Sequence, residues 1–458
     1  MIGTPPGSRP TDASEAPSAR SFTARVLRLG RRGHGLVLAP DFPRPLPAPA
    51  TLPDELIEFQ VALDARERPF AHVLRVLESH PERVPADCEQ AAGCPGCPLR
   101  HWAPSVALTH KLADARALFA RIYGAPAPPG ALRGAAPRDG FRGRLSAGNC
   151  GGIPGMRAHP GHPPVDLRRC PAQTPEVRAA LAVLWADLAA AGVQSDVQRV
   201  LLTTTDTAET RAILTVDDAN AAAHVRSSAL VERPGRSIFT SVLGQKAARS
   251  RRAEEVTTLL QGCTALTFRR GEDHLTATLP AWTPQSPDSV PMLLEWAREA
   301  LQPEGASVLE LGCGVGTLSL PLARSAAHLL GVDCVRPAIA DAQANATRAG
   351  VENAAFRLGF AHHAVRRLLA GPQRFDAILL HGMRQPFGER LMGVLPALGA
   401  ARIAYAAPLT SSLADDLRAL PGYTIERLDF LDQMPGTAHL MALASLRRGA
   451  AGAAILRT

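Results

Sequence analysis

A strand that runs into a glycine-rich turn is the feature that most restricts what this chain can fold into. Residues 308–316 read VLELGCGVG, and a helical pattern, TLSLPLARSA, follows at once. Glycine tolerates positive φ and lets the backbone approach a ligand closely. The next strand, 331–333, ends in Asp333, whose carboxylate can accept hydrogen bonds from ribose hydroxyls. The pattern predicts a nucleoside site, against the alternative of a purely structural turn.

Strand and helix patterns alternate through residues 288–447. Alternation of this kind predicts an α/β fold, a doubly wound parallel sheet with helices on both faces, closed here by an antiparallel pair of strands. The E-x-G-x-G-x-G form of the loop resembles S-adenosylmethionine-dependent methyltransferases of the Rossmann-like class I type. The resemblance implies cofactor contacts from Glu310, Gly312, Gly314, Gly316 and Asp333.

Two regions of different pattern precede this domain. Residues 21–82 hold short apolar runs separated by Gly, Pro and Asp, which predict a small OB-like β-barrel. Residues 83–287 mix strand and helix patterns and are expected to form an α+β domain. Helices are expected in it over 106–123, 175–192 and 253–262.

The chain ends and the overall charge constrain the setting of the protein. Residues 1–20 are rich in Pro, Ser and Gly and predict a disordered tail, and 448–458 form a second tail. No apolar run is long enough to span a membrane, and no secretory signal is visible, so we expect a cytoplasmic monomer. The net charge of +8 suits a polyanionic partner such as RNA, although a merely basic soluble protein fits equally well.

Four cysteines have a spacing typical of a metal centre. Cys88, Cys94 and Cys97 follow the pattern C-x5-C-x2-C, and Cys170 lies further along the chain. Four thiolates can bind either Zn²⁺ or a [4Fe–4S] cluster, and spacing alone does not choose between them. A zinc site that uses His101 and a set of reduced thiols are the other interpretations.

The order of these features resembles the RNA (uracil-C5)-methyltransferase family. The resemblance rests on HPERVPADCEQAAGCPGCPLRHW, on the distant Cys170 and on ELGCGVG, and it covers residues 20–447. It implies that the barrel is a TRAM domain, that the four cysteines hold a [4Fe–4S] cluster, and that the substrate is ribosomal or transfer RNA.

Two further segments are similar to this family. Residues 139–144, DGFRGR, resemble its G-Y-R-N-K segment, which lies in the RNA-facing central domain. Clustered arginines here would contact RNA phosphates, unless the segment is simply a solvated basic loop; they are Arg133, Arg138, Arg142 and Arg144. Residues 282–287, WTPQSP, resemble the family's F-F-Q-V-N-P run, with the glutamine, Gln285, displaced by one place.

The family's chemical groups are replaced at the matching positions. Its mechanism adds a cysteine thiolate to C6 of uracil and later removes the C5 proton with a carboxylate. Here the cysteine position is Pro408 and the glutamate position is Met441, and no cysteine follows Cys334. The adenine-side aspartate falls on Phe360, and the aspartate of the family's D-P-P-R loop falls on His381.

Two functions therefore stay open. The first is an RNA methyltransferase of the uracil-C5 family with altered activity, in which His381 or His439 substitutes for a lost group or the acceptor is another atom. The second is a catalytically inactive RNA-binding iron–sulfur protein. Both rest on the family resemblance.

Overall fold

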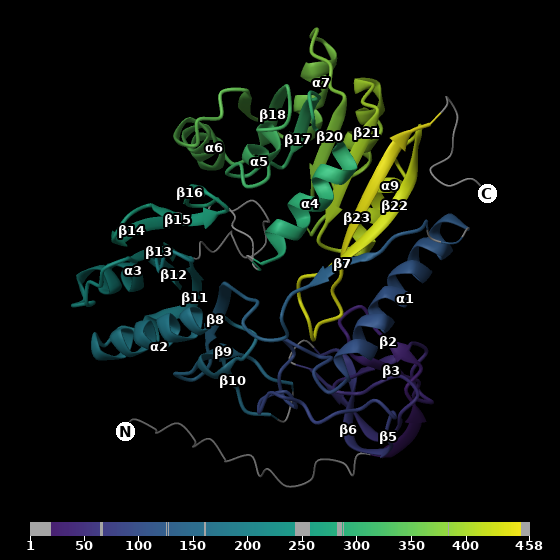
Figure 1. The fold of residues 1–458 in the computed structure, drawn as a ribbon. Helices are drawn as coiled ribbons and strands as arrows, with labels where there is room; N and C mark the ends of the chain where they lie inside the picture. Colours follow the sequence, from purple (N-terminus) through teal and green to yellow (C-terminus); the bar gives the residue numbers. More distant parts are fainter. Residues whose placement is uncertain are drawn as a thin grey trace, which may run out of the picture.

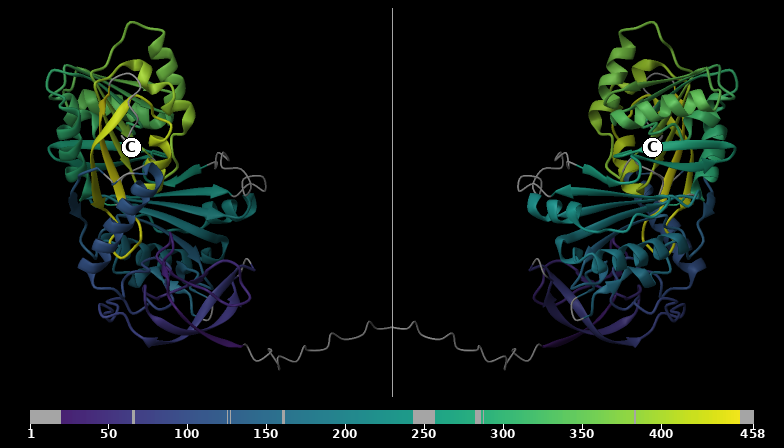
Figure 2. Two further views of the ribbon diagram at one scale, coloured as in Figure 1. Left: turned by 90° about the vertical axis from the view of Figure 1, so that its right-hand side faces the viewer. Right: turned by 90° about the vertical axis from the view of Figure 1, so that its left-hand side faces the viewer.

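A computed structural model shows the three parts of the chain stacked on one another (Figures 1 and 2). The structure describes residues 20–64, 67–124, 126, 128–159, 162–242, 257–281, 286, 288–382 and 384–449. Residues 1–19 and 450–458, which make up most of the two expected tails, lie outside these ranges, as does Gln285. Within the described ranges, every helix is too short or too polar to cross a bilayer.

The N-terminal part is rich in strands, as the sequence predicts. Its antiparallel strands pair in the orders β1-β5-β6 and β2-β3-β4. Alternating apolar residues pack between the two sheets, and Val37, Ile57 and Phe59 are fully buried there. The strands are β1 (Ser21–Arg25), β2 (Arg28–Leu29), β3 (Gly35–Val37), β4 (Leu46–Ala48), β5 (Leu56–Leu63) and β6 (Pro69–Glu78).

The central part is a mixed sheet with helices on one face. The strand order is β10-β9-β8-β11-β12-β13-β14, and helices α2 and α3 cover the face that carries Leu145, Ala212 and Ile238. The elements are β8 (Arg144–Asn149), β9 (Pro154–Met156), β10 (Val165–Asp166), η1 (Leu167–Arg169), α2 (Pro175–Ala190), η2 (Gln194–Asp196), β11 (Val197–Thr204), β12 (Thr210–Val216), α3 (Ala219–Ser227), β13 (Arg236–Val242) and β14 (Thr257–Gln261).

One expected helix of this region is wrong. The apolar spacing of 253–262 predicted a helix, but its described part is the edge strand β14, which pairs antiparallel with β13. The backbone hydrogen bonds that β13 offers outweigh a weak local preference, and the β-branched Thr257 and Thr258 suit a strand. The helix expected over 106–123 is present as α1 (Pro104–Tyr123), and Pro104 occupies its first turn.

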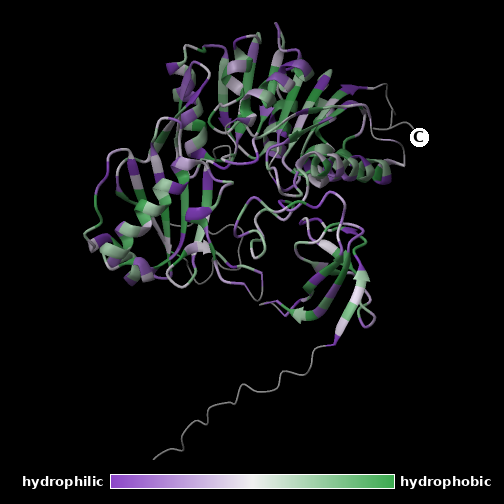
Figure 3. Cartoon of the chain, turned by 60° about the horizontal axis from the view of Figure 1, so that its bottom comes forward, coloured by the Kyte–Doolittle hydropathy of each residue, from purple (hydrophilic) through white to green (hydrophobic). Residues whose placement is uncertain are grey.

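The C-terminal part is the predicted α/β sheet. Its order is β19-β18-β17-β20-β21-β23-β22-β7, with parallel pairing from β19 to β21 and antiparallel pairing of β23 with both neighbours. Apolar strands lie between helices, and purple, hydrophilic stretches lie mainly on the outer faces (Figure 3). The elements are α4 (Ser289–Leu301), β17 (Ser307–Leu311), α5 (Ser319–Ala323), β18 (His328–Asp333), α6 (Arg336–Arg348), β19 (Ala354–Leu358), α7 (Ala361–Leu369), β20 (Ala377–His381), α8 (Glu389–Met392), η3 (Leu395–Leu398), β21 (Arg402–Ala407), α9 (Thr410–Leu417), β22 (Tyr423–Asp432) and β23 (Met441–Arg448).

Two links tie this sheet to earlier parts of the chain. Strand β7 (Leu132–Ala135) pairs parallel with β22 at the edge of the C-terminal sheet. The hairpin of β15 (Ala265–Arg270) and β16 (Asp273–Thr278) packs on α6, where Thr276 N donates to Asn345 Oδ1 at 2.9 Å. Figure 1 shows this hairpin between the central sheet and α6.

A buried ion pair fixes helix α1 against the same sheet. Lys111 Nζ lies 2.7 Å from both carboxylate oxygens of Asp432, and the two side chains are 4% and 6% exposed. Burial lowers the pKa of Lys111, while the Asp432 carboxylate opposes that shift. The attraction that fixes α1 on the sheet therefore requires a protonated Lys111 and an ionised Asp432.

We predict that Lys111→Met destabilises the protein by about 3–5 kcal/mol, because Asp432 would be left as an unpaired buried charge. The double variant Lys111→Met/Asp432→Leu should recover part of that loss. Urea unfolding measures both, with Arg25→Gln, which breaks an exposed pair with Glu78, as the control. A single variant as stable as the wild type would show that the pair does not orient α1.

Candidate functional site: a nucleoside crevice and a group of thiols

The glycine loop lies at the carboxyl end of β17, where the sequence placed it. Gly312, Gly314 and Gly316 have φ values of 90°, 55° and 89°. A Cβ at Gly312 would collide with the carbonyl oxygen of His381, so only glycine fits this close approach. A Cβ at Gly314 would meet no described atom within 4 Å, so open space lies beside the loop at the carboxyl ends of β17 and β18; we call this space the crevice.

Asp333 fixes the loop from the end of the neighbouring strand, β18. Its Oδ2 accepts a hydrogen bond from Gly314 N at 3.0 Å, and its Oδ1 accepts one from Val335 N at 2.9 Å. A carboxylate has further lone pairs on each oxygen. Asp333 can thus hold the loop and still accept hydrogen bonds from the hydroxyls of a bound ribose.

Glu310 is completely buried beneath the loop. Its Oε2 accepts a hydrogen bond from Ser319 Oγ at 2.5 Å, while among the described residues its Oε1 has no partner. Burial raises the pKa of Glu310 to about 7, and the Asp333 charge adds to the rise against the opposing effect of the Ser319 hydrogen bond. A buried acceptor without a partner is costly, so this carboxylate fits a site that gains a polar ligand. S-adenosylmethionine carries a cationic amino group and ribose hydroxyls, which suit these two acids.

His381, at the end of β20, and Phe360, just after β19, bring an imidazole and an aromatic ring to the edge of the sheet that carries Asp333. His381 ends β20 and is neutral at physiological pH, because burial lowers its pKa to about 4 despite the nearby Asp333 charge. Phe360 follows β19 and is 59% exposed. Gly359 N donates to Asp333 O at 2.9 Å, which places Phe360 near Asp333.

The two positions that the resemblance matches to catalytic groups adjoin one pair of neighbouring strands. The antiparallel register of β21 and β23 ends with Ala407 opposite Ala442. Pro408 directly follows Ala407, and Met441 directly precedes Ala442. Neither side chain carries a nucleophilic or basic atom.

His439 approaches this pair from the preceding loop. Its Nε2 lies 3.2 Å from Arg384 Nη2, and burial together with the Arg384 charge lowers its pKa to about 4. The pairing with Arg384 occupies the ring nitrogen that a general base would use. A role in orienting Arg384 fits this geometry better than proton transfer.

The four predicted metal-binding cysteines come together in space. Burial raises the pKa of Cys94 to about 11, and the neighbouring thiols Cys97, Cys170 and Cys88 add to the rise. At the same time, no three His, Cys, Asp or Glu side chains of the described chain stand in a metal-binding arrangement. The surroundings of His101 do not support zinc coordination with these thiols, because its imidazole lies beside Arg83 and Glu55 and hydrogen-bonds to the backbone of Thr51.

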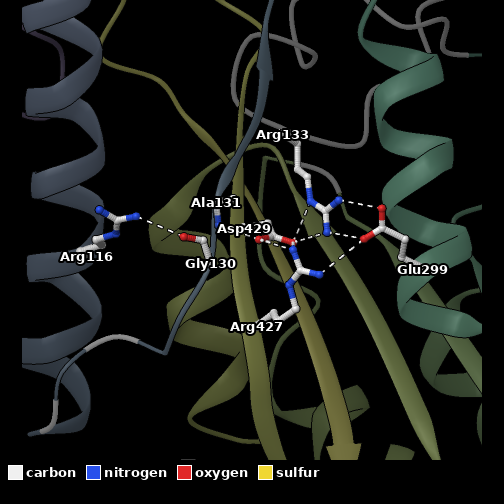
Figure 4. Close-up of polar contacts among 7 residues, drawn as sticks. All are labelled: Arg116, Gly130, Ala131, Arg133, Glu299, Arg427 and Asp429. Carbon is white, nitrogen blue, oxygen red and sulfur yellow. Dashed lines mark hydrogen bonds and ion pairs between the residues drawn. The ribbon is translucent and has the colours of Figure 1, made fainter.

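Three of the four predicted RNA-binding arginines are engaged within the protein. Figure 4 shows Arg133 between Asp429 and Glu299, at 2.8 Å and 2.6 Å, with Arg427 beside them. Arg138 Nε lies 2.7 Å from Asp87 Oδ2, and Arg142 Nη2 donates to the Gly96 carbonyl at 3.2 Å. Arg144 is the one of the four whose side chain has no hydrogen bond or ion pair to a described residue.

Some residues of the site were missed from the sequence. Ser319 holds the buried Glu310, and Lys111 pairs with Asp432 near the His439 loop. Arg211 lies beside Arg144 on the central sheet. Only Arg211 could have been found from the sequence. In the strand pattern TRAILTV, Ala212 and Leu214 lie on one face, so Arg211 lies on the other, away from the helix-covered core.

The fold and the glycine–acid crevice define a class I methyltransferase domain in the C-terminal part. The family described as "Methyltransferase domain" matches residues 303–400. The chain is similar to the 23S rRNA (uracil(1939)-C(5))-methyltransferase RlmD of Pectobacterium carotovorum subsp. carotovorum (strain PC1), with 26% identity over 96% of both chains. It is 28% identical to RlmD of Edwardsiella ictaluri (strain 93-146), over 86% of this chain and 88% of that one.

A solved structure shares the fold of nearly the whole chain. It is the Pyrococcus abyssi tRNA (uracil-54, C5)-methyltransferase in complex with S-adenosyl-L-homocysteine, with a TM-score of 0.70 and 20% identity. It covers 93% of this chain and 99% of its own. The predicted α/β fold with a C-terminal class I methyltransferase domain and a strand-rich N-terminal part is thus confirmed.

The raised pKa of Glu310 leads to a prediction on stability. Between the ordinary value of 4.5 and the native value of about 7, the folded protein holds this proton more tightly than the unfolded chain does. Wild-type stability should therefore fall as pH rises through that interval. Glu310→Gln is neutral throughout, so it should equal the wild type near about pH 4.5 and exceed it by up to about 3 kcal/mol near about pH 8.

Urea unfolding of the two proteins across this pH range measures the effect. Glu426→Gln removes an exposed carboxylate on β22 and serves as the control. A constant difference between Glu310→Gln and the wild type at all pH values would show that Glu310 does not titrate as proposed.

Proposed function

We propose that the protein is an S-adenosylmethionine-dependent RNA methyltransferase built on the framework of the uracil-C5 enzymes. The observation that carries the proposal is the intact glycine–acid crevice, in which Asp333 holds Gly314 and Glu310 keeps a buried oxygen without a partner among the described residues. The similarity to RlmD proteins over nearly the whole chain supports RNA as the substrate.

The crevice assigns a role to each side chain. Asp333 would bind the ribose, Glu310 would attract the cationic end of the cofactor, and the glycines would let the cofactor approach the backbone. Gln285 is a further candidate, which lies outside the described residues. The cofactor supplies a sulfonium-bound methyl group, and the protein has to orient an acceptor atom toward it.

The acceptor is proposed to be an atom other than uracil C5. Activation of C5 requires a nucleophile at C6 and a base, and Pro408 and Met441 supply neither. A base nitrogen or a ribose oxygen reacts without such an adduct. His381 lies at the crevice and is the candidate to receive the proton that such an acceptor loses, but burial lowers its pKa to about 4 and so makes it a weak base.

A catalytically inactive RNA-binding iron–sulfur protein is the second candidate. Pro408 and Met441 favour it, because the resemblance matches both to the family's chemical groups and neither side chain supplies a thiol or a carboxylate. In that case the central sheet and the N-terminal strands, proposed as a TRAM domain, would bind RNA without transfer, favoured by the net charge of +8.

The group of thiols is proposed to hold a [4Fe–4S] cluster. Cys88, Cys94, Cys97 and Cys170 influence one another electrostatically, and a cationic cluster would relieve the cost of burying neighbouring thiolates. The resemblance in spacing to the uracil-C5 enzymes favours iron–sulfur over zinc.

A transfer assay tests the proposed activity. Purified protein, labelled S-adenosylmethionine and total RNA should give a labelled nucleoside other than 5-methyluridine. Asp333→Ala should abolish transfer and weaken S-adenosylhomocysteine binding, measured by calorimetry, roughly ten- to hundredfold. Glu426→Gln is the control.

Three results would decide against this reading. Label at uracil C5 would show that the argument from Pro408 and Met441 is wrong. Cofactor binding without transfer to any RNA would favour the inactive RNA-binding protein. Wild-type protein that binds no S-adenosylhomocysteine would contradict the cofactor site itself.

Anaerobic purification tests the cluster. The sample should be brown, with broad absorption near roughly 400 nm, and should contain iron and sulfide. Cys94→Ser should lose the absorption, whereas Cys150→Ser, outside the group, should keep it. A colourless protein that contains zinc would contradict the iron–sulfur proposal.

A further inference from the structure

A polar row crosses the central sheet on the face that α2 and α3 leave uncovered. The register aligns Thr203 of β11 with Arg144 of β8 on one side and with Arg211 of β12 on the other, and Arg211 in turn with Ser237 of β13. The residues next to them in sequence, Leu145, Leu202, Ala212 and Ile238, belong to the helix-covered core. Since side chains alternate along a strand, the row points away from that core.

The row faces the methyltransferase domain. Arg211 Nη1 donates to the Ala277 carbonyl of β16 at 3.2 Å, and β16 is hydrogen-bonded to α6 through Thr276 and Asn345. At the other end of the row, Ser237 lines an open cavity of about 580 Å³. The row is therefore at the junction between the central sheet and the domain that holds the crevice.

Two cations lie close together in this row. Neighbouring strands are about 4.8 Å apart, so Arg144 and Arg211 are separated by roughly 10 Å at their backbones, and both side chains can reach over Thr203. Burial, together with the Arg144 charge, lowers the pKa of Arg211 to about 10, against the opposing effect of Asp341. Arg211 is 5% exposed.

Arg144 lacks the compensation that the other predicted arginines have. Among the described residues it has no carboxylate partner and no hydrogen-bond acceptor, and burial lowers its pKa. Partial burial of a guanidinium beside a second cation costs free energy, which a bound anion would offset. A phosphate group has several acceptor oxygens and can accept hydrogen bonds from the guanidinium groups of Arg144 and Arg211 at the same time.

We propose that Arg144, Thr203 and Arg211 form a phosphodiester-binding site for the substrate RNA, at the junction between the central sheet and the methyltransferase domain. The proposal rests on RNA being the substrate, and it does not require methyl transfer. Contact with the RNA phosphodiester backbone is thus assigned to Arg144, one of the four arginines expected from the sequence, and to Arg211, which was not expected. Arg133, Arg138 and Arg142 instead hold the protein together.

RNA binding by the full-length protein tests the site. The probe is a fluorescein-labelled single-stranded RNA about a dozen nucleotides long, followed by anisotropy over a salt series. Arg144→Gln should weaken binding roughly tenfold and should reduce the salt slope by about 0.7, the value for one phosphate contact. Arg226→Gln, on α3 over the opposite face, should bind as the wild type does.

Thermal unfolding gives a second readout that separates a ligand site from a structural role. Without ligand, Arg144→Gln should melt at the same temperature as the wild type or higher, because it removes an uncompensated charge. Sodium pyrophosphate should raise the melting temperature of the wild type more than that of Arg144→Gln. Arg211→Lys, which keeps the charge but not the planar fork, should show an intermediate loss of RNA affinity.

The outcomes distinguish this site from the proposed function. Unchanged RNA affinity of Arg144→Gln would overturn the phosphodiester site, whatever its melting temperature and even if methyl transfer is observed. Loss of affinity in Arg144→Gln would support the site even if no transfer to RNA is found. Wild-type protein that binds no RNA would overturn both proposals.

Discussion

The buried contact between Lys111 and Asp432 is the constraint on which the arrangement of the parts depends. It joins α1, from the first third of the chain, to β22, near its end. The backbone continues the same link, because Ala136 N donates to Asp432 O and β7 extends the C-terminal sheet. A charge pair buried this deeply tolerates little displacement. Helix α1 and strand β7 are therefore held in a defined position on the sheet that carries the crevice.

The segment that carries Cys88, Cys94 and Cys97 packs against the loop between β22 and β23. Leu99 N donates to the Gly436 carbonyl at 2.9 Å, and a Cβ at Gly436 would contact Arg100 and Cys97. The segment that carries His439 therefore rests on the loop that carries the thiols. The proposed metal centre would support the shape of this part of the chain.

Local pattern predicted some parts well and failed at others for identifiable reasons. The alternation after residue 288 and the glycine loop gave the α/β sheet and the position of Asp333, because buried parallel strands and tight turns leave strong local signals. The segment 253–262 was taken for a helix because its apolar spacing is ambiguous, and only the pairing with β13 decides its described part. Arg133 was expected at the RNA, but Asp429 and Glu299, almost 300 and about 170 residues away in the chain, bind it instead.

The sequence by itself determined the class of the C-terminal domain, and it predicted the grouping of the cysteines and the replacement of the thiol and the carboxylate, since each depends on residue type and short spacing. Only the tertiary structure decided which arginines already have partners in the described chain, that Pro408 and Met441 adjoin the same pair of strands, and that Glu310 keeps an oxygen without a partner there. Those facts depend on contacts between strands distant in sequence, where burial and pairing of charge are set by the whole fold and not by neighbouring residues.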